Sequence, residues 1–572
     1  MTSLGRVYGS TPRRLAASAV RLAAEDAGMP LGELDGLLIC PGISGGLDVG
    51  LAAVLGLRDL SLLAVINSFG ASAVTAVQVA AQAVAAGTAR AVACVFADTP
   101  LREGVPAGSA FGSHGAPSAG SGASAPPERH GLSGLAVGYG FRSVSVYYAL
   151  AARRHMQAYR TTSEQFGAVA VSQREWAAGN PAAQFRDPIT LADHQGSRWV
   201  AEPLHLLDCS LVSNGAIAVI VTSADAAAAG PRPPVHVWGW GQGHPGQPMA
   251  RGTEFGLRTG AAQSGRAAMA MAKVRAADIT MAQIYDCYTY TVLVTLEDYG
   301  FCDKGDAGPF AASGALGPGG SLPVNTGGGQ LSGYYMWGFT PLSEAVIQAR
   351  GDGGARQSSA NDLILVSGNG GILSHHGTLI VSPHPRAGAG FTSPAGRARP
   401  ERVAATGAAA CGGAGTAATD GAVRSRTAGP VELGGPEDIG VIRADPRSEP
   451  FFRAAAQGEL LIRRCEPCGD WFAPTSSGCP GCGADADELA WAAASGHGTL
   501  VSWSVVHPRA GGQVAVPALV ELDEGPWLAT ALRLRGPGEL AGLRAGLAVT
   551  AVFEAPAEGE AYPMFRLAGT PA

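Results

Sequence analysis

Residues 1–385 alternate between short uninterrupted apolar runs and longer stretches of small residues with helical spacing. Apolar runs bounded by Gly, Asn or Ser are typical of buried strands. The small-residue stretches are typical of helices packed closely on a sheet. Strands are predicted at 36–40, 62–66 and 91–96, and helices at 11–28, capped by Thr11 and ended by Gly28, and from 72 to about 86.

The same alternation returns in the second part of this region, although no clean sequence repeat is visible. Two similar halves predict an α/β fold of layered, duplicated halves. In this part, strands are predicted at 235–240, 283–285, 363–366 and 377–381, and helices at 261–275, at 291–299 and after Pro341.

Composition divides the rest of the chain. Residues 102–134 are rich in Gly, Ser, Ala and Pro, which predicts a mobile surface loop within a domain spanning 1–385. Residues 386–445 are predicted to be a flexible linker, because most of this segment lacks apolar periodicity. After it, a helix and paired cysteines at 446–490 and alternating strands at 491–572 predict a zinc ribbon followed by a small β-barrel.

Charge and hydropathy exclude several classes of function. The 572 residues include only 15% charged side chains, and the net charge is −6, so no nucleic-acid partner is expected. No uninterrupted apolar run is long enough to span a bilayer, and the N-terminal segment lacks the apolar core of a signal peptide. We therefore expect no membrane association and a cytoplasmic location.

Four of the ten cysteines form two CxxC pairs, Cys465 with Cys468 and Cys479 with Cys482. Two such pairs at short separation are typical of a tetrahedral zinc site in a reducing compartment. Four protein thiolates leave no open coordination position, so the predicted zinc is structural rather than catalytic.

A glycine-rich stretch with two tyrosines is the strongest candidate for a reacting site. Residues 324–338 read Val-Asn-Thr-Gly-Gly-Gly-Gln-Leu-Ser-Gly-Tyr-Tyr-Met-Trp-Gly and lead into a predicted helix. Glycines let the backbone approach a ligand closely, and tyrosine hydroxyls can donate or accept protons. An ordinary loop beside a buried aromatic pair fits these residues equally well.

Several motifs in residues 1–385 resemble the thiolase superfamily, in particular SCP-x-like lipid-transfer thiolases and steroid side-chain aldolases. The resemblance implies a thiolase fold and, by analogy, a dimer. The most specific pieces are Arg186-Asp-Pro-Ile-Thr, Pro203-Leu-His-Leu-Leu-Asp-Cys, Tyr285-Asp-Cys-Tyr-Thr, Leu296-Glu-Asp-Tyr-Gly-Phe-Cys, Pro323-Val-Asn-Thr-Gly-Gly-Gly and Ser367-Gly-Asn-Gly-Gly.

The C-terminal part is similar to the DUF35 family, a rubredoxin-like zinc ribbon joined to an OB-fold. The CxxC pairs and the run Ser-Gly-His-Gly-Thr-Leu-Val-Ser at 495–502 carry this resemblance. DUF35 proteins accompany thiolase-like enzymes and help to bind acyl-CoA, so the resemblance implies that two such units are fused here.

The chain departs from the thiolase pattern where the chemistry occurs. Gly70 stands where thiolases carry their nucleophilic Cys, and the nearby Ser72 lacks an evident base. Tyr335 replaces the His of the Gly-His-Pro motif, and Tyr285 replaces the oxyanion-site Asn or His. Ser367 replaces the second Cys. Without a thiol, an acyl-enzyme intermediate is not expected.

These departures favour retro-aldol cleavage of a β-hydroxyacyl-CoA without a covalent intermediate. Tyr285 and Tyr335 are the predicted base and acid, and an unperturbed Tyr is a weak base at neutral pH, so a lowered pKa or a relay is required. Candidate relay residues are Asp286, His375 and His376. Backbone amides are predicted to hold the thioester enolate at Gly328, Gly329, Gly370 and Gly371.

Two alternatives stay open on the sequence alone. One is a C-acyltransferase or Claisen-type enzyme that works without the usual Cys, as found in biosynthetic pathways. The other is a non-catalytic acyl-CoA-binding scaffold. Whether the DUF35-like part docks on its own chain or on a second copy is also open, because a linker of this length permits either.

Overall fold

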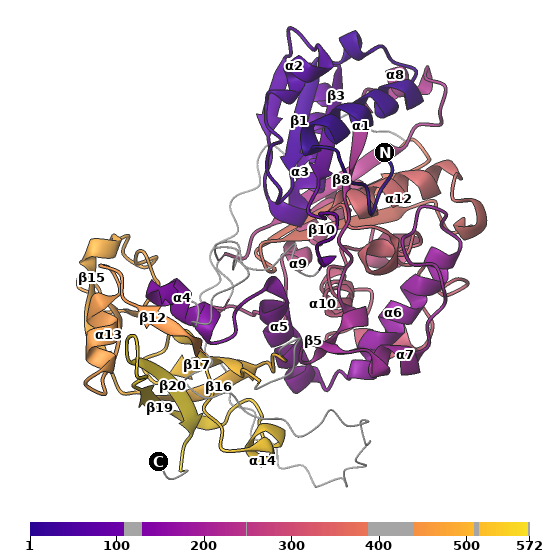
Figure 1. Ribbon diagram of the computed structural model, residues 1–572. Coiled ribbons are helices and arrows are strands. Elements are labelled where there is room, and N and C mark those ends of the chain that lie inside the picture. Colours follow the sequence, from indigo (N-terminus) through magenta and orange to yellow (C-terminus); the bar gives the residue numbers. More distant parts are fainter. Residues whose placement is uncertain (108–127, 247–248, 387–438, 508–513, 570–572) are drawn as a thin grey trace.

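The computed structural model describes residues 1–107, 128–246, 249–386, 439–507 and 514–569. The chain forms a layered α/β body, with a small three-stranded sheet and a barrel at its C-terminal end (Figure 1). None of the helices in the described ranges is long and apolar enough to cross a membrane.

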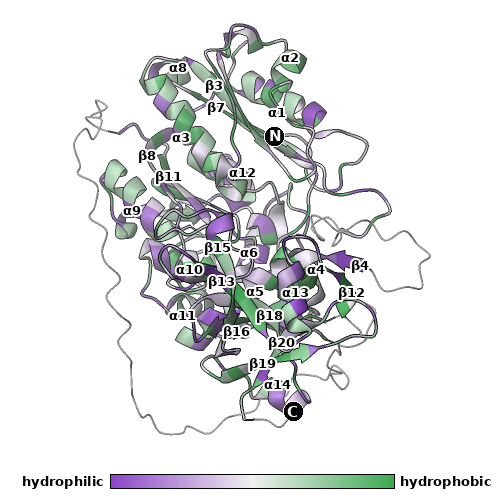
Figure 2. Cartoon of the chain, turned by 90° about the vertical axis from the view of Figure 1, so that its left-hand side faces the viewer, coloured by the Kyte–Doolittle hydropathy of each residue, from purple (hydrophilic) through white to green (hydrophobic). Residues whose placement is uncertain are grey.

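The first sheet is apolar on both faces. Its strands in spatial order are β2 (Leu62–Val65), β1 (Gly36–Pro41), β3 (Ala91–Asp98) and β7 (Gly215–Thr222). Helix α1 (Pro12–Asp26) covers the outer face, and α3 (Ser72–Ala85) covers the inner face. Every residue of β3 is therefore buried, and Figure 2 shows these strands as hydrophobic.

The second sheet lies on the other side of α3. Its strands in spatial order are β8 (His236–Gly243), β11 (His375–Ser382), β10 (Ile364–Gly370) and β9 (Met281–Gln283). Helix α9 (Ala261–Ala272) covers its outer face. Helix α12 (Phe339–Arg350) lies beside α3 in the layer between the two sheets. The result is a helix-sheet-helix-sheet-helix layering, as the predicted duplicated fold requires.

Alternate glycines on β8 explain how closely α9 packs. A Cβ built on Gly241 would lie 2.2 Å from the carbonyl oxygen of Ser264, and one on Gly243 would lie 2.2 Å from that of Gly260. A side chain at either position would push the helix off the sheet. The sequence Trp-Gly-Trp-Gly-Gln-Gly thus encodes direct contact between helix and strand.

Helices between β3 and β7 and after β9 surround one end of the body. Their positions bring α5 (Val144–Tyr159), α6 (Ser163–Ala178) and α10 (Thr289–Tyr299) next to the segments that follow β9 and precede α12. The other helices and strands of the body are α2 (Leu51–Leu55), α4 (Gly131–Gly138), α7 (Leu191–Gly196), β5 (Trp199–Ala201), β6 (Leu204–His205), α8 (Ala224–Ala228) and α11 (Ala307–Ala312).

The C-terminal part contains a ribbon and a barrel. The ribbon has α13 (Glu449–Ala455) and strands β13 (Leu460–Cys465), β14 (Trp471–Phe472) and β15 (Leu489–Ala494). A bridge between Leu532 and Phe565 closes the barrel. In spatial order its strands are β18 (Trp527–Ala531), β17 (Pro517–Leu522), β16 (His497–Trp503), β19 (Ala548–Glu554) and β20 (Tyr562–Leu567), with α14 (Pro537–Ala541) before β19.

A small parallel sheet joins two segments that the sequence predicts to be loop and linker. Strand β4 (Glu128–His130) pairs with β12 (Val441–Arg443). The loop prediction for 102–134 is therefore wrong at 128–134, where β4 and the first turn of α4 lie, and the linker prediction is wrong at 441–443. Local composition carried no sign of this pairing because the two strands are distant in sequence. Residues 108–127 and 387–438 lie outside the described part of the chain.

Candidate active site

Two tyrosines meet where the segments after β9 and before α12 converge. The hydroxyl oxygens of Tyr285 and Tyr335 are 3.1 Å apart and share a hydrogen bond. The Tyr335 amide donates to Ser213 Oγ at 2.9 Å, which fixes its backbone. Burial raises the pKa of both phenols above the ordinary value, so both are neutral at physiological pH. The site lowers the pKa of neither phenol, so neither tyrosine can act as a free tyrosinate base. Proton transfer along the hydrogen bond between them is the remaining way for the pair to act as acid and base.

Gly70 is the position at which this site has no room for a nucleophile. A Cβ there would lie 2.3 Å from Tyr285 Cε2 and 2.1 Å from the carbonyl oxygen of Asn369. The Tyr285 ring thus occupies the space that a Cys side chain would need. Ser72 is buried and its Oγ accepts a hydrogen bond from the Ser68 amide at 2.9 Å, so it closes the turn before α3.

Asp286 anchors the glycine-rich turn rather than facing the tyrosine hydroxyls. Its carboxylate accepts hydrogen bonds from the amides of Gln330, at 2.9 and 3.0 Å, and Leu331, at 3.3 Å. Burial raises the pKa of Asp286 to about 7, although these amides oppose the shift. The turn is η6, a single π-type turn over Gly329–Gly333.

Close backbone contacts and positive φ values explain why glycine stands at the predicted enolate-binding positions. Gly328 and Gly329 have φ values of +87° and +57°, and a Cβ on Gly329 would lie 2.1 Å from Asp286 Oδ2. Gly370 allows the segment before α3 to approach β10, because a Cβ there would lie 2.4 Å from the Ser68 carbonyl oxygen. Gly371 follows with a φ of +60° at the turn toward β11.

The two histidines lie in different surroundings. His376 is fully buried on the face of β11 that α9 and α10 cover, and its Nε2 lies 3.0 Å from Ser367 Oγ and 3.2 Å from the hydroxyl of Tyr299. Burial lowers the pKa of His376 to about 3, so it is neutral. His375, the preceding residue on the strand, is half-buried and stacks on Phe69 with ring centroids 6.3 Å apart.

Alternation along β11 therefore separates the predicted relay residues. Gly377 faces α3, because a Cβ there would lie 2.8 Å from Val74, while His376 and Thr378 face the opposite layer. The structure brings Tyr285 and Tyr335 together and places His376 on the other face of the sheet, where its hydrogen bonds run to Ser367 and Tyr299.

Sequence reasoning missed two residues beside the tyrosines. Tyr148, on α5, and Cys287 are both buried close to the pair, and both add to the raised pKa of Tyr285. Burial raises the pKa of Cys287 to about 12, so its thiol stays protonated. Cys287 lies in the Tyr-Asp-Cys-Tyr motif, so the sequence could have identified it as a site residue. No motif marks Tyr148, because it reaches this site from a distant part of the chain.

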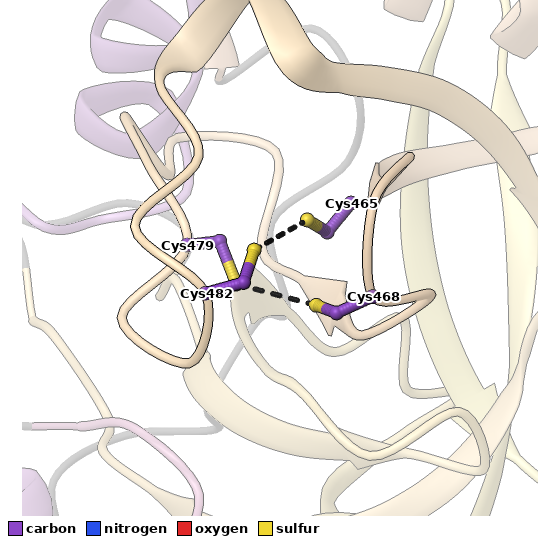
Figure 3. Close-up of side chains that lie close together, drawn as sticks. All are labelled: Cys465, Cys468, Cys479 and Cys482. Carbon is purple, nitrogen blue, oxygen red and sulfur yellow. Dashed lines mark hydrogen bonds between the residues drawn. The ribbon is translucent and has the colours of Figure 1, made fainter.

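The four ribbon cysteines converge on one point (Figure 3). Their sulfur atoms all lie within 4.8 Å of one another, with Cys465 and Cys482 at 3.4 Å and Cys468 and Cys479 at 3.5 Å. Tetrahedral zinc with bonds of about 2.3 Å requires sulfur separations of about 3.8 Å, so the set fits zinc. Gly469 and Gly483 close equivalent turns after the two pairs, each amide donating at 2.9 Å to the first cysteine's carbonyl.

The chain is 36% identical over 377 residues to "Steroid side-chain-cleaving aldolase" of Thermomonospora curvata, a match that spans 64% of this chain and 93% of that protein. It is also 36% identical over 392 residues to "17-hydroxy-3-oxo-4-pregnene-20-carboxyl-CoA lyase" of Mycobacterium tuberculosis, across 94% of that protein. The chain belongs to the thiolase-like aldolase family.

Family models divide this thiolase-like aldolase into recognisable parts. Residues 241–383 match "Thiolase C-terminal domain-like". Residues 452–488 match "ChsH2, rubredoxin-like zinc ribbon domain", and residues 491–554 match "ChsH2, C-terminal OB-fold domain". The predicted DUF35-like ribbon and OB-fold are thereby confirmed as to family, and the four cysteines lie in a rubredoxin-like zinc ribbon.

Solved structures agree with this assignment. The chain resembles "Ltp2-ChsH2(DUF35) aldolase" at 35% identity with a TM-score of 0.58, over 67% of this chain and 95% of that one. A monomeric SCP2-thiolase-like protein from Mycobacterium smegmatis matches 98% of both chains with a TM-score of 0.60 and 13% identity, which supports the fold alone. The predicted thiolase-like fold and the lyase class of the family are confirmed.

Proposed function

We propose that this aldolase cleaves the Cα–Cβ bond of a β-hydroxyacyl-CoA by a retro-aldol reaction without an acyl-enzyme. The observation that carries the proposal is the Tyr285 ring in the space of the missing nucleophile, with its hydroxyl 3.1 Å from that of Tyr335. A pair of neutral hydroxyls in hydrogen-bond contact supports proton transfer and offers no group for acylation.

The two phenols form a relay that needs no free tyrosinate. One tyrosine oxygen accepts the proton of the substrate's β-hydroxyl, its own proton passes along the hydrogen bond to the second tyrosine, and the second tyrosine gives its own proton to Cα in the same concerted step. The electron pair of the breaking Cα–Cβ bond develops as an enolate on the thioester and takes up that proton at Cα, and a ketone or aldehyde leaves. Both phenols end neutral, which accords with the raised pKa of each.

The enolate oxygen needs hydrogen-bond donors while the bond breaks. At η6 the amides of Gln330 and Leu331 already donate to the Asp286 carboxylate, so these two amides are not available to an enolate oxygen. We assign the donor role to the backbone at Gly370 and Gly371, which adjoins the segment bearing Gly70. Asp286 and His376 are assigned to holding the site's framework, and neither is placed in the relay.

The alternative of a C-acyltransferase lacks a nucleophile in this geometry. Gly70 excludes a side chain, and the nearby Cys287 thiol has a pKa raised to about 12. A thiol that stays protonated is a poor acyl acceptor. A non-catalytic scaffold would have no use for two converging hydroxyls, so the lyase is favoured over both alternatives.

The relatives' names point to the class of substrate. The lyase of Mycobacterium tuberculosis is named for a pregnene CoA thioester with a 17-hydroxyl group. That hydroxyl lies on the ring carbon next to the carbon bearing the CoA carboxyl, so it is a tertiary β-hydroxyl. We propose a bulky tertiary β-hydroxyacyl-CoA as substrate, cleaved to a cyclic ketone and a shorter acyl-CoA.

The four cysteine thiolates would hold one structural zinc that fixes the ribbon beside the barrel.

Strand β2 is an edge of the first sheet and exposes Leu63 and Val65, which makes it a template for pairing with a second copy. We propose a homodimer through this edge. Val65→Lys would convert it to a monomer in analytical ultracentrifugation, and an unchanged mass would exclude this interface.

Mass spectrometry of the products tests the function. Tertiary β-hydroxyacyl-CoA thioesters would be incubated with wild type, with Tyr335→Phe and with the matched control Tyr334→Phe. In wild type the Tyr334 hydroxyl hydrogen-bonds to Ser343 at 3.1 Å and not to Tyr285. We expect wild type and Tyr334→Phe to release a ketone and a shorter acyl-CoA, and Tyr335→Phe to release neither. Acyl transfer to an added nucleophile would favour the transferase, and CoA-ester binding without any turnover would favour the scaffold.

A further inference from the structure

Helix α5 lies between the body and the OB-fold barrel and contacts both (Figure 1). Its residues toward the barrel are Leu150, Arg153, Arg154 and Gln157, and those toward the tyrosine site are Ser145 and Tyr148. At 100° per residue the centres of these two sets are separated by roughly 160° around the helix. One rigid element therefore presents opposite faces to two parts of the chain.

The barrel holds the second half of α5 by several contacts. Ser502 Oγ donates to the Leu150 carbonyl at 2.7 Å. The Arg153 guanidinium lies 5.2 Å from the centre of the Trp503 ring, and that of Arg154 lies 4.8 Å from the centre of the Trp527 ring. Partly desolvated arginine-aromatic contacts of this kind fix side-chain position strongly. The helix cannot shift without breaking them.

The first half of α5 holds the segment that bears Tyr285. Ser145 Oγ and the Tyr288 hydroxyl are 2.9 Å apart, and the Tyr148 and Tyr288 rings have centroids 4.6 Å apart. Tyr288 is the N-cap of α10 and follows closely after Tyr285 in the chain. The position of α5 therefore limits where Tyr285 can lie relative to Tyr335.

We infer that the OB-fold fixes the tyrosine pair through α5, with Ser145 and Tyr148 as positioning residues for Tyr285. A hydroxyl pair separated by 3.1 Å loses its proton path after a small displacement, so the barrel contributes to turnover without touching the reacting atoms. The kinetic consequence rests on the proposed lyase function. The structural coupling does not, and it is measured separately.

Hydrogen exchange measures the coupling. A double variant, Arg153→Ala with Ser502→Ala, removes two barrel contacts of α5, whereas Arg443→Ala removes an ion pair between β12 and β4, Arg443 with Glu128, in which α5 takes no part. The pairing of β4 with β12 keeps the barrel docked in both. Exchange of the α5 amides at 147–151 is expected to rise about tenfold in the double variant only. Equal exchange in all three proteins would overturn the inference.

Kinetics test whether the barrel affects the tyrosine pair through α5. The double variant and Ser145→Ala are each expected to lower kcat about tenfold with KM changed less than about twofold, and Ser145→Thr restores the hydroxyl and the rate. When combined, their losses are expected not to multiply, because both act through the same helix. Multiplying losses would overturn the inference. If wild type cleaves no β-hydroxyacyl-CoA, the proposed function fails and the exchange result still decides the coupling.

Discussion

The zinc ribbon and the tyrosine site are built in opposite ways. All four sulfur atoms of the ribbon come from the segment 465–482, and two equivalent turns set their positions. The tyrosine site draws on residues near positions 70, 148, 285 and 335, and only the folded body brings them together. A metal centre of this kind is a local property of sequence, whereas the reacting pair is a property of the whole fold.

That difference predicts how each site fails. The ribbon gains most of its stability from its zinc ligands, so their loss unfolds the ribbon and leaves the barrel and the tyrosine site formed. The tyrosine site depends on neighbours that exclude other side chains, so a single added methyl group can disturb it.

Removal of zinc is expected to have the largest effect on stability. Cys468→Ser with Cys479→Ser, or chelation, would cost the ribbon on the order of 10 kcal/mol of metal-derived folding free energy. Calorimetry would then show a separate, lower transition for the ribbon. Cys302→Ser, which lies outside the ribbon, serves as control and keeps the zinc content. An unchanged melting profile after complete zinc loss would contradict the structural role.

Loss of either phenol is expected to have the largest effect on catalysis. Tyr285→Phe and Tyr335→Phe would each lower kcat by about 10²- to 10⁴-fold, the usual contribution of a positioned acid or base. Circular dichroism should remain that of wild type, because the rings stay in place. Activity within a few-fold of wild type in either variant would remove that residue from the relay.

A side chain at Gly70 is expected to damage stability and turnover together. Gly70→Ala places a Cβ 2.3 Å from the Tyr285 ring, and overpacking of this kind costs about 1–3 kcal/mol. Thermal denaturation measures the loss. Gly32→Ala is the matched control, because a Cβ there meets no atom within 4 Å. Equal melting temperatures for both variants would show that Tyr285 does not fill this space.

Asp286 is expected to give stability a pH dependence of smaller size. Its pKa is raised to about 7 in the folded protein, so between about pH 4 and 7 the folded state binds more protons than the unfolded state. The contribution of this group is most favourable near pH 4 and falls as pH rises through 7, by at most about 1.4 kcal/mol per unit. Urea unfolding should show this slope reduced in Asp286→Asn. The same slope in both proteins would contradict the assignment.

His376 is expected to have the smallest effect on catalysis. It lies on the opposite face of β11 from the layer that contains α3, so His376→Gln should change kcat by less than about threefold. A loss as large as that of Tyr335→Phe would return it to the proton relay.

Sequence predicted the layered halves, the ribbon and the tyrosine pair because each leaves a local or family pattern. The strand-turn-helix order and the CxxC spacing are such patterns, and Tyr285 and Tyr335 stand at positions that the thiolase resemblance marks. It did not place His376, because strand alternation turns adjacent histidines to opposite faces and the motif does not say which face meets the site. It missed Tyr148 because that residue meets Tyr285 only in the folded body, from a distant part of the chain.

The loop and linker predictions are wrong at 128–134 and 441–443 for a related reason. The strands at 128–130 and 441–443 are only three residues each and form by pairing between two segments far apart in the chain. Strand propensity depends on a partner, and here the partner lies in another domain.

The pairing of β4 with β12 also affects when this part of the protein can fold during synthesis. His130 pairs with Arg443, which is synthesised much later. At about 5–20 residues per second, β4 waits roughly 15–60 s on the ribosome before its partner strand exists. During that time the nascent body carries an unpaired strand, and chaperone binding would protect it until the C-terminal part emerges.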